Sequence, residues 1–219
     1  LLSGQYTPRH GVYAVGSTNR GPENLMRMVP VPNTGGLPPD EFTLPKAMKS
    51  AGYATGMFGK WHLDGSGGSK PEEHFDVVKV GGHGWSKQVE GDPKAIFSIT
   101  TAACEFIEAN KDRPFFAYIP HYAIHSPLQS RADVFEKFKK KPSGTLHNSA
   151  SNAACLAELD EGVGLVLKKL ADLGLEENTL VAFTSDNGGT VESQEPLRGK
   201  KGCYYEGGIR EPTIVRWPA

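Results

Sequence analysis

Short apolar runs alternate with amphipathic segments along this chain, and that order constrains the fold more than any other feature. The apolar runs have the length of strands and lie at 53–58, 115–119 and 180–183. Residues with apolar side chains at helical spacing precede the three runs, at 43–52, 98–110 and 156–174. Strands that alternate with helices form mostly parallel sheets with right-handed crossovers. We therefore predict an α/β fold with a mostly parallel sheet flanked by helices on both faces.

The third apolar run is followed directly by residues that suit a metal ion. Leu180 to Phe183 has the composition of a strand buried on both faces, and Asp186 and Asn187 come just after it. Ligands of parallel sheets bind outside the carboxyl ends of the strands. A carboxylate and an amide oxygen are hard ligands of the kind that calcium or magnesium prefers. The alternative is an ordinary turn, since Asp-Asn-Gly-Gly tolerates positive φ.

The first apolar run ends in Gly-Lys-Trp-His-Leu. In an extended backbone Lys60 and His62 share one face and Trp61 packs on the other. A lysine and a histidine would then point together into the crevice at the strand end. The alternative for a lone pair of this kind is a solvated lysine and a histidine held in the core.

The second apolar run leads into Pro-His-Tyr-Ala-Ile-His-Ser-Pro, which places His121 and His125 at another strand end. One of the two is expected to pack or to hydrogen-bond within the loop. Further on, Arg198, Lys200 and Lys201 sit among glycines, where basic side chains on a close-approaching backbone suit an oxyanion. The alternative for this basic stretch is a solvated loop.

Composition limits the classes of protein to which the chain can belong. Its 219 residues are 38% hydrophobic and 22% charged, so it can bury a core, and we expect one globular domain or a large part of one. The formal net charge of -1 gives no reason to expect nucleic acid as a partner. No apolar run is long enough to span a bilayer. The three cysteines lack metal-ligand spacing, and the oligomeric state stays open.

Several charged groups and histidines are expected to be structural or solvated. His74 and His83 have no third group at ligand spacing, so we assign them to the surface without a role. The basic run within 131–142 is interpreted as the solvated face of a short helix, with a sulfated polymer lying along it as the alternative. Asp160 and Glu161 are interpreted as exposed helix charges. Thr43 is expected to cap the helix that follows it.

Four motifs taken together closely resemble the sulfatase family. They are Gly-Lys-Trp-His-Leu at 59–63, Ser-Asp-Asn-Gly-Gly at 185–189, Leu-Arg-Gly-Lys-Lys-Gly at 197–202 and Tyr-Glu-Gly-Gly-Ile-Arg-Glu-Pro at 205–212. The resemblance is to formylglycine-dependent, arylsulfatase-like members of the alkaline phosphatase superfamily, and it covers nearly the whole chain. It implies an alkaline-phosphatase-like core. Asp64 departs from the family pattern, which usually has Gly at that position.

The resemblance implies a role for each matching polar residue. Lys60 and Lys201 would contact the sulfate, and His62 would help to hold the formylglycine. His125 would bind the sulfate ester and protonate the departing oxygen. His121 is a second-choice contact.

The resemblance also implies a metal and a nucleophile. Asp186 and Asn187 would bind Ca²⁺, with Mg²⁺ as a possibility. The formylglycine, formed from a Cys or Ser, is expected upstream of Leu1. Residues 1–219 would then be part of one catalytic domain, without its N-terminal strand and nucleophile motif and without its C-terminal part.

The function implied by the resemblance is hydrolysis of a sulfate monoester, on an aryl compound or a carbohydrate, by a formylglycine- and calcium-dependent mechanism. Two alternatives stay open. One is a phosphate or phosphonate monoester hydrolase of the same superfamily, and the other is a non-catalytic relative that binds sulfated glycans. The resemblance suggests a location that is periplasmic, extracellular or lysosomal, and nothing in the residues identifies the compartment or the sulfated substrate.

Overall fold

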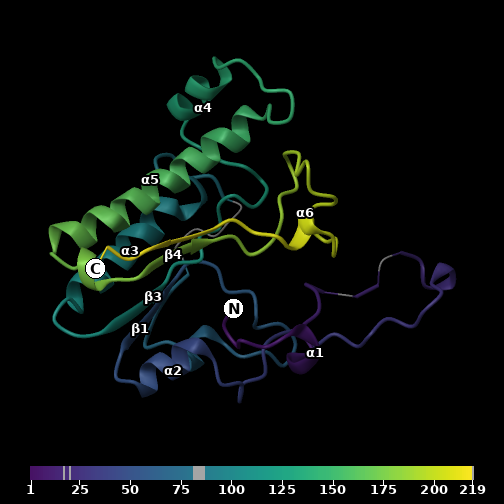
Figure 1. The fold of residues 1–219 in the computed structure, drawn as a ribbon, viewed down its shortest axis with the longest axis horizontal. Helices are drawn as coiled ribbons and strands as arrows, with labels where there is room; N and C mark the ends of the chain where they lie inside the picture. Colours follow the sequence, from purple (N-terminus) through teal and green to yellow (C-terminus); the bar gives the residue numbers. More distant parts are fainter. Residues whose placement is uncertain (17, 20, 81–86, 219) are drawn as a thin grey trace. The chain divides into compact units, whose positions relative to one another are not determined.

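A computed structural model describes residues 1–16, 18–19, 21–80 and 87–218. The chain divides into two compact units (Figure 1). The first unit joins Leu1–Val80 with Ala109–Pro120. The described part of the second unit joins residues 87–108 with residues 121–218. His83, which the sequence places at the surface, lies outside the described residues.

The first unit is built on a three-stranded parallel sheet. Strand β1 (Ala54–Phe58) lies in the centre, with β2 (Val77–Lys79) on one side and β3 (Phe115–Tyr118) on the other. All five residues of β1 are buried, as expected for a central strand that carries small and apolar side chains. The rings of Phe75 and Tyr118 stack beside the sheet with their centroids 6.1 Å apart.

Short helices complete the first unit. They are α1 (Thr7–His10), α2 (Leu44–Ser50) and the 3₁₀ turns at Glu23–Leu25 and Pro71–Glu73. Helix α2 packs against β1. Pro45 lies in its first turn, where no backbone N–H is needed, and Gly52 takes φ +87° just after it. The prediction of a helix followed by a strand is confirmed here.

His74 is buried, so its assignment to the surface was wrong. Its Nδ1 lies 2.9 Å from the hydroxyl of Thr43, and its Nε2 lies 2.7 Å from the hydroxyl of Ser69. Thr43 does occupy the N-cap position of α2, but its side chain bonds His74 and makes no hydrogen bond to the helix. Burial lowers the pKa of His74 below the ordinary value of 6.5, and the charge of Lys46 lowers it further.

Stability should therefore fall as the medium is acidified. A histidine whose pKa is lower in the folded than in the unfolded chain adds stability above the unfolded value of 6.5, and that stability is lost as the pH falls below it. His74→Gln should lower the free energy of unfolding at pH 7.5 by about 1–3 kcal/mol, because buried partners lose a hydrogen bond. The variant's free energy of unfolding should also fall less steeply than that of the parent protein between pH 7.5 and 5. Urea unfolding at several pH values measures both, and His62→Gln, which changes an exposed histidine, should keep the decline.

The second unit is organised around two helices, α3 (Ile96–Ala109) and α5 (Ala150–Asp172). They run side by side in the same direction, and the Lys169 ammonium lies 2.9 Å from the Glu108 carboxylate. A Cβ at Gly162 would lie 2.9 Å from the Ile96 side chain and 3.0 Å from the Thr100 hydroxyl, so the glycine lets α5 pack closely against α3. Gly174, at φ +67°, follows the end of α5 as predicted.

Helix α4 (Ala132–Lys139) packs against α5 and carries the basic run. Its lysines are exposed, which confirms the interpretation as a solvated face. Asp160 and Glu161 are exposed as well, and Glu161 forms an ion pair with the Arg131 guanidinium. Arg131 also donates from its backbone N–H to the buried Glu158 carboxylate at 2.9 Å. These contacts fasten the start of α4 to α5.

The chain ends in an antiparallel pair of strands, β4 (Val181–Thr184) and β5 (Thr213–Arg216), with α6 (Glu206–Ile209) before β5. Further 3₁₀ turns lie at Pro93–Ala95 and Glu176–Asn178. Residues of β4 alternate between half-buried and exposed, so the prediction of a strand buried on both faces was wrong. The strand belongs to a two-stranded sheet, and alternate side chains face outward.

The α/β class with a parallel sheet and flanking helices is confirmed. Among the described residues, no helix combines the length and the apolar character that a membrane crossing requires.

Candidate active site

The carboxyl end of β1 presents Lys60 and His62. The Lys60 N–H donates to the carbonyl of Pro120 at 2.7 Å, so the chain leaves β1 beside the end of β3. Trp61 turns the other way, with its indole N–H donating to the carbonyl of Ser69 at 2.9 Å. His62 is exposed and Lys60 is half-buried. The alternative of a core histidine thus fails for His62, and it is His74 that has this structural role.

The loop after His62 accepts Asp64 without strain. Asp64 forms an antiparallel bridge with Gly36, and among the described non-glycine residues only Lys94 and Ala95 have positive φ. A Cβ at Gly36 would lie 2.0 Å from the carbonyl oxygen of Leu63, so here the two backbones touch directly. The departure at Asp64 therefore leaves an ordinary backbone at that position.

His121 and His125, which follow β3, have different surroundings. His121 is half-buried, with its Nε2 lying 3.1 Å from the hydroxyl of Thr100 on α3. His125 is exposed, and its Nδ1 lies 2.7 Å from the carbonyl oxygen of Ser126. A carbonyl can only accept, so Nδ1 carries a proton and Nε2 is the nitrogen that exchanges one. His125 therefore hydrogen-bonds within the loop, as expected for one of the pair, whereas His121 bonds a residue of α3.

The carboxyl end of β4 holds Asp186 and Asn187 in a tight turn. The Ser185 hydroxyl donates to the carbonyl of Asn187 at 3.1 Å. Asp186 is exposed and Asn187 is half-buried. Thr184, the last residue of β4, pairs with Thr213 at the start of β5, so the turn lies beside the residues that precede β5.

Glycines pack this turn against two other loops, which hold Lys201 and α6. The Gly188 N–H donates to the carbonyl of Gly208 at 3.1 Å, and the Lys201 N–H donates to the carbonyl of Gly189 at 3.3 Å. A Cβ at Gly188 would lie 2.0 Å from the carbonyl oxygen of Gly207. We call residues 185–189, 198–203 and 206–209 the glycine cluster. It brings Asp186, Asn187 and Lys201 into one part of the structure.

The basic residues of the glycine cluster are not equivalent. The Arg198 guanidinium lies over the Tyr205 ring, 3.9 Å from its centroid, and makes a cation–π contact with it. Lys200 and Lys201 are exposed, and the backbone of Lys201 is the one that bonds the Asp186 turn. Of the three basic residues, Lys201 is therefore the one that the backbone fixes beside the candidate metal ligands.

Glu211 is a residue of this region that sequence reasoning missed. Burial raises the pKa of its carboxyl, as does the negative charge of Asp186, and a hydrogen bond from Ser185 opposes the shift. One carboxylate oxygen of Glu211 is buried without a hydrogen-bond partner. In the sequence Glu211 stands in the Arg-Glu-Pro that follows Gly-Gly-Ile. This segment contributed to the family resemblance but gave no separate reason to expect a functional carboxylate.

The residues around the Asp186 turn fit the chemistry of a hard cation. Two carboxylates, on Asp186 and Glu211, repel one another here, and a divalent cation beside them would remove that repulsion. Asn187 adds an amide oxygen. Calcium takes 6–8 oxygen ligands, more than these side chains offer. In the part of the chain that the structure describes, no three His, Cys, Asp or Glu side chains gather as a complete metal site.

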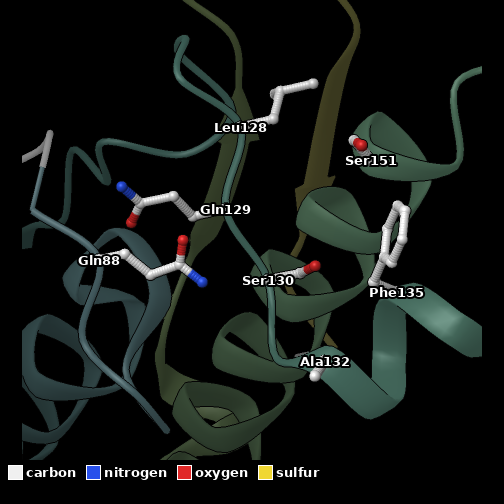
Figure 2. Close-up of a pocket in the computed structure, with 7 residues that line it drawn as sticks. All are labelled: Gln88, Leu128, Gln129, Ser130, Ala132, Phe135 and Ser151. Carbon is white, nitrogen blue, oxygen red and sulfur yellow. The ribbon is translucent and has the colours of Figure 1, made fainter.

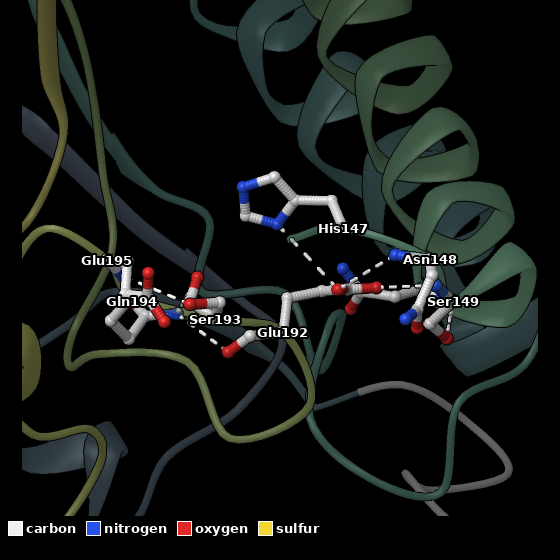
Figure 3. A network of polar contacts seen from close by, with 8 residues as sticks. His147, Asn148, Ser149, Glu192, Ser193, Gln194 and Glu195 are labelled. Carbon is white, nitrogen blue, oxygen red and sulfur yellow. Dashed lines mark hydrogen bonds and ion pairs between the residues drawn. The ribbon is translucent and has the colours of Figure 1, made fainter. Parts of the chain in front are cut away.

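Glu192 ties the continuation of the Asp186 turn to the start of α5 (Figure 3). Its carboxylate accepts from the backbone N–H groups of Ser149 at 2.8 Å and Asn148 at 3.2 Å, and it lies 3.7 Å from Nδ1 of His147. The N–H groups at a helix start lack partners within the helix and favour negative charge. Glu192 satisfies them and thereby anchors the loop.

The predicted site residues fall into two groups. Lys60 and His62 lie in the first unit, whereas His125 and the Asp186 turn with Lys201 lie in the second. The ends of β1 and β3 lie side by side, as their parallel register and the Lys60 to Pro120 hydrogen bond show. The functional roles of these residues stay predictions.

Comparisons with known proteins identify the family. The Sulfatase family model matches residues 1–219. A sulfatase from Formosa agariphila is 31% identical over 100% of this chain and 52% of its own length. The N-acetylgalactosamine-6-sulfatase of Canis lupus familiaris is 29% identical over 100% of this chain and 47% of its own length. This chain thus spans about half the length of the curated relatives it matches.

Solved structures show the same fold. The crystal structure of Ps i-CgsB in complex with k-i-k-neocarrahexaose superimposes with a TM-score of 0.73, at 25% sequence identity, over 99% of this chain and 53% of that one. The match of the family model over residues 1–219 and the 31% identity to the Formosa protein agree with the motifs and with the fold. The chain belongs to the sulfatase family.

Proposed function

We propose that the protein hydrolyses sulfate monoesters, of a carbohydrate or an aryl compound, with a formylglycine nucleophile and a bound Ca²⁺. The observation that carries this proposal is the glycine cluster, in which backbone contacts hold Asp186, Asn187 and Lys201 together in a chain of the sulfatase family. An oxygen-rich turn for a cation beside a lysine suits a small anionic ester.

The lysines and the cation would act on the sulfate group. Lys60 and Lys201 offer ammonium groups that bind sulfate oxygens and stabilise the charge that builds on them in the transition state. Asp186 and Asn187 would hold the Ca²⁺, with Glu211 as a neighbouring negative group. The metal supplies Lewis acidity at a sulfate oxygen when bound, and the formylglycine supplies the nucleophilic oxygen.

His125 would protonate the departing oxygen. Its Nδ1 is already committed to the carbonyl of Ser126, so Nε2 is the atom that would deliver the proton. His62 is exposed at the end of β1, where it would orient the nucleophile. General acid catalysis contributes most when the leaving group is a poor one, as a sugar alkoxide is.

The leaving-group dependence of a His125→Asn variant tests this assignment. We expect kcat/KM for a sugar or alkyl sulfate to fall by about 100- to 10,000-fold, because the alkoxide then departs unprotonated. The loss for 4-nitrophenyl sulfate should be about 10-fold or less, since nitrophenolate needs little protonation. Steady-state sulfate release from the two esters gives the ratio.

His121→Asn is the matched control, because it changes the histidine that bonds Thr100. Its loss of activity should be equal for both esters. Equal losses for the two esters with His125→Asn would remove the general-acid role.

Faster turnover of the corresponding phosphate ester by the parent protein would favour the phosphohydrolase alternative, and tight binding of sulfated glycan without any turnover would favour the non-catalytic one.

A further inference from the structure

A cavity of about 240 Å³ lies in the second unit between the segment after His125 and helices α4 and α5 (Figure 2). Its lining residues are Gln88, Leu128, Gln129, Ser130, Ala132, Phe135 and Ser151. In Figure 2 the amides of Gln88 and Gln129 lie together on one side, and Phe135 and Ser151 lie on the other. No role is assigned to this cavity by the motifs discussed above.

The cavity wall is fixed before any ligand arrives. Gln129 is 6% exposed, and its side-chain oxygen accepts from the backbone N–H of Lys94 at 3.1 Å. The backbone N–H of Arg131, two residues on, donates to the buried Glu158 carboxylate on α5. A binding site with a fixed wall loses less conformational entropy when it binds.

The lining chemistry suits a neutral ring that bears hydroxyl groups. Amide and hydroxyl side chains both donate and accept, and Phe135 offers an aromatic edge or face to C–H groups. None of the described residues that line the cavity has a charged side chain. Pockets for drug-sized ligands have volumes of roughly 300–1,000 Å³, so a cavity of 240 Å³ has room for about one ring.

The position of the cavity connects it with the candidate general acid. Leu128, in the cavity wall, is three residues after His125. Three residues of extended chain span at most about 11 Å. A ring in the cavity and a sulfate group at His125 are therefore close enough to belong to one small oligosaccharide.

One lysine of α4 lies beside the cavity and is paired with a carboxylate on the same helix. Nζ of Lys139 lies 5.8 Å from the centroid of the Phe135 ring and 3.1 Å from the Glu136 carboxylate. Lys137, Lys140 and Lys141 are exposed on the same helix or just after it. Lys137 and Lys141 lie over the ring of Phe138, outside the cavity lining. The excess of lysines on and just after α4 would attract a glycan whose neighbouring units carry sulfate groups.

From these observations we propose that the cavity binds one sugar ring of a sulfated oligosaccharide while the sulfate ester of another unit lies at His125. This assignment rests on the proposed function and narrows its substrate class from any sulfate ester to a sulfated carbohydrate of at least two units. The rigid Gln129 and Ser130 wall and the Phe135 ring would recognise the ring, and the α4 lysines would attract the chain.

The test compares a sulfated oligosaccharide with 4-nitrophenyl sulfate, which is too small to fill both positions. We expect Phe135→Ala to lower the ratio of kcat/KM for the oligosaccharide to kcat/KM for the aryl sulfate by about 10-fold, because the ring loses its aromatic contact. Gln88→Ala, at an exposed position, should lower the same ratio by about fivefold. The probes are sulfated galactan and glycosaminoglycan oligosaccharides of two to six units.

Phe138→Ala is the matched control, since Phe138 is a half-buried aromatic residue of the same helix outside the cavity lining. It should keep the ratio of the parent protein. An unchanged ratio in both Phe135→Ala and Gln88→Ala overturns the assignment and leaves the proposed function intact. Because Gln88 is exposed, its variant gives a result even if Phe135→Ala fails to fold.

Binding measurements distinguish a failure of the proposed hydrolysis from a failure of the cavity as a glycan site. If the parent protein hydrolyses none of these esters, the proposed function fails, and calorimetric titration with the same oligosaccharides then tests the cavity alone. Binding that Phe135→Ala and Gln88→Ala weaken, and that Phe138→Ala leaves unchanged, would support the cavity as a glycan site. Binding that is equal in all three variants, or absent from the parent protein, would overturn it.

Discussion

Asp186→Ala should lower sulfate release by at least about 1,000-fold, while the protein stays folded. In the proposed site this carboxylate is a cation ligand that holds a Lewis acid beside the sulfate, and the loss of such a charge typically costs several kcal/mol of transition-state stabilisation. Burial raises the pKa of the Glu211 carboxyl, and the charge of Asp186 adds to this shift, so the removal of Asp186 also ends a repulsion. In calcium-free buffer the melting temperature should therefore stay the same or rise.

Three measurements check this expectation. Steady-state kinetics gives the activity, calorimetric titration with CaCl₂ gives the affinity for the metal, and thermal unfolding in EDTA gives the stability. Asp160→Ala is the control, because Asp160 is an exposed carboxylate on α5 away from the turn. The metal assignment fails if Asp186→Ala keeps both the calcium affinity and the activity of the parent protein.

Gly188→Ala should damage both stability and activity, although it adds only one methyl group. The new Cβ would lie 2.0 Å from the carbonyl oxygen of Gly207, and that atom belongs to a backbone that cannot rotate away as a side chain can. Overpacking of this kind costs about 1–3 kcal/mol in the free energy of unfolding. A shift of about 1 Å in the Asp186 turn can cost about 100-fold in rate.

Gly164→Ala provides the contrast, since a Cβ there meets nothing within 4 Å and the residue lies inside helix α5. Glycine in a helix interior is less stable than alanine by roughly 0.5–1 kcal/mol, so this variant should be slightly more stable than the parent. Chemical denaturation and activity per folded molecule compare the two. If Gly188→Ala behaves like Gly164→Ala, the close packing of the glycine cluster has no bearing on function.

Periodicity and strand-end chemistry predicted most of the fold. The mostly apolar segment 53–58 predicted the central strand, and the helical spacing of apolar residues at 156–174 predicted helix α5. The second sheet was not predicted, since a short run such as 180–183 does not reveal the strand with which it pairs. Strand β4 pairs antiparallel with β5, which follows α6 much later in the chain.

The burial of polar side chains could not be predicted from the sequence. His74 has no neighbour in sequence that marks it as buried, and its two hydrogen-bond partners, Thr43 and Ser69, come from separate segments. Glu211 was missed for a related reason, because its proximity to Asp186 depends on the pairing of β4 with β5. The cavity beside Phe135 is also beyond sequence patterns, since it is shaped by three segments that meet only in space.

The glycine cluster sets a limit on how a protein of this kind can diversify. Its three loops touch through backbone atoms, and a Cβ at Gly207 would lie 2.2 Å from the carbonyl oxygen of Gly199, just as one at Gly188 would collide with Gly207. No loop of the cluster can be lengthened or exchanged alone without displacing the other two. Grafting from another protein would have to transfer residues 185–211 as a single block. The cavity that we propose for a sugar ring is lined by side chains, so a substitution at an exposed position such as Gln88 changes the lining without a backbone collision of this kind.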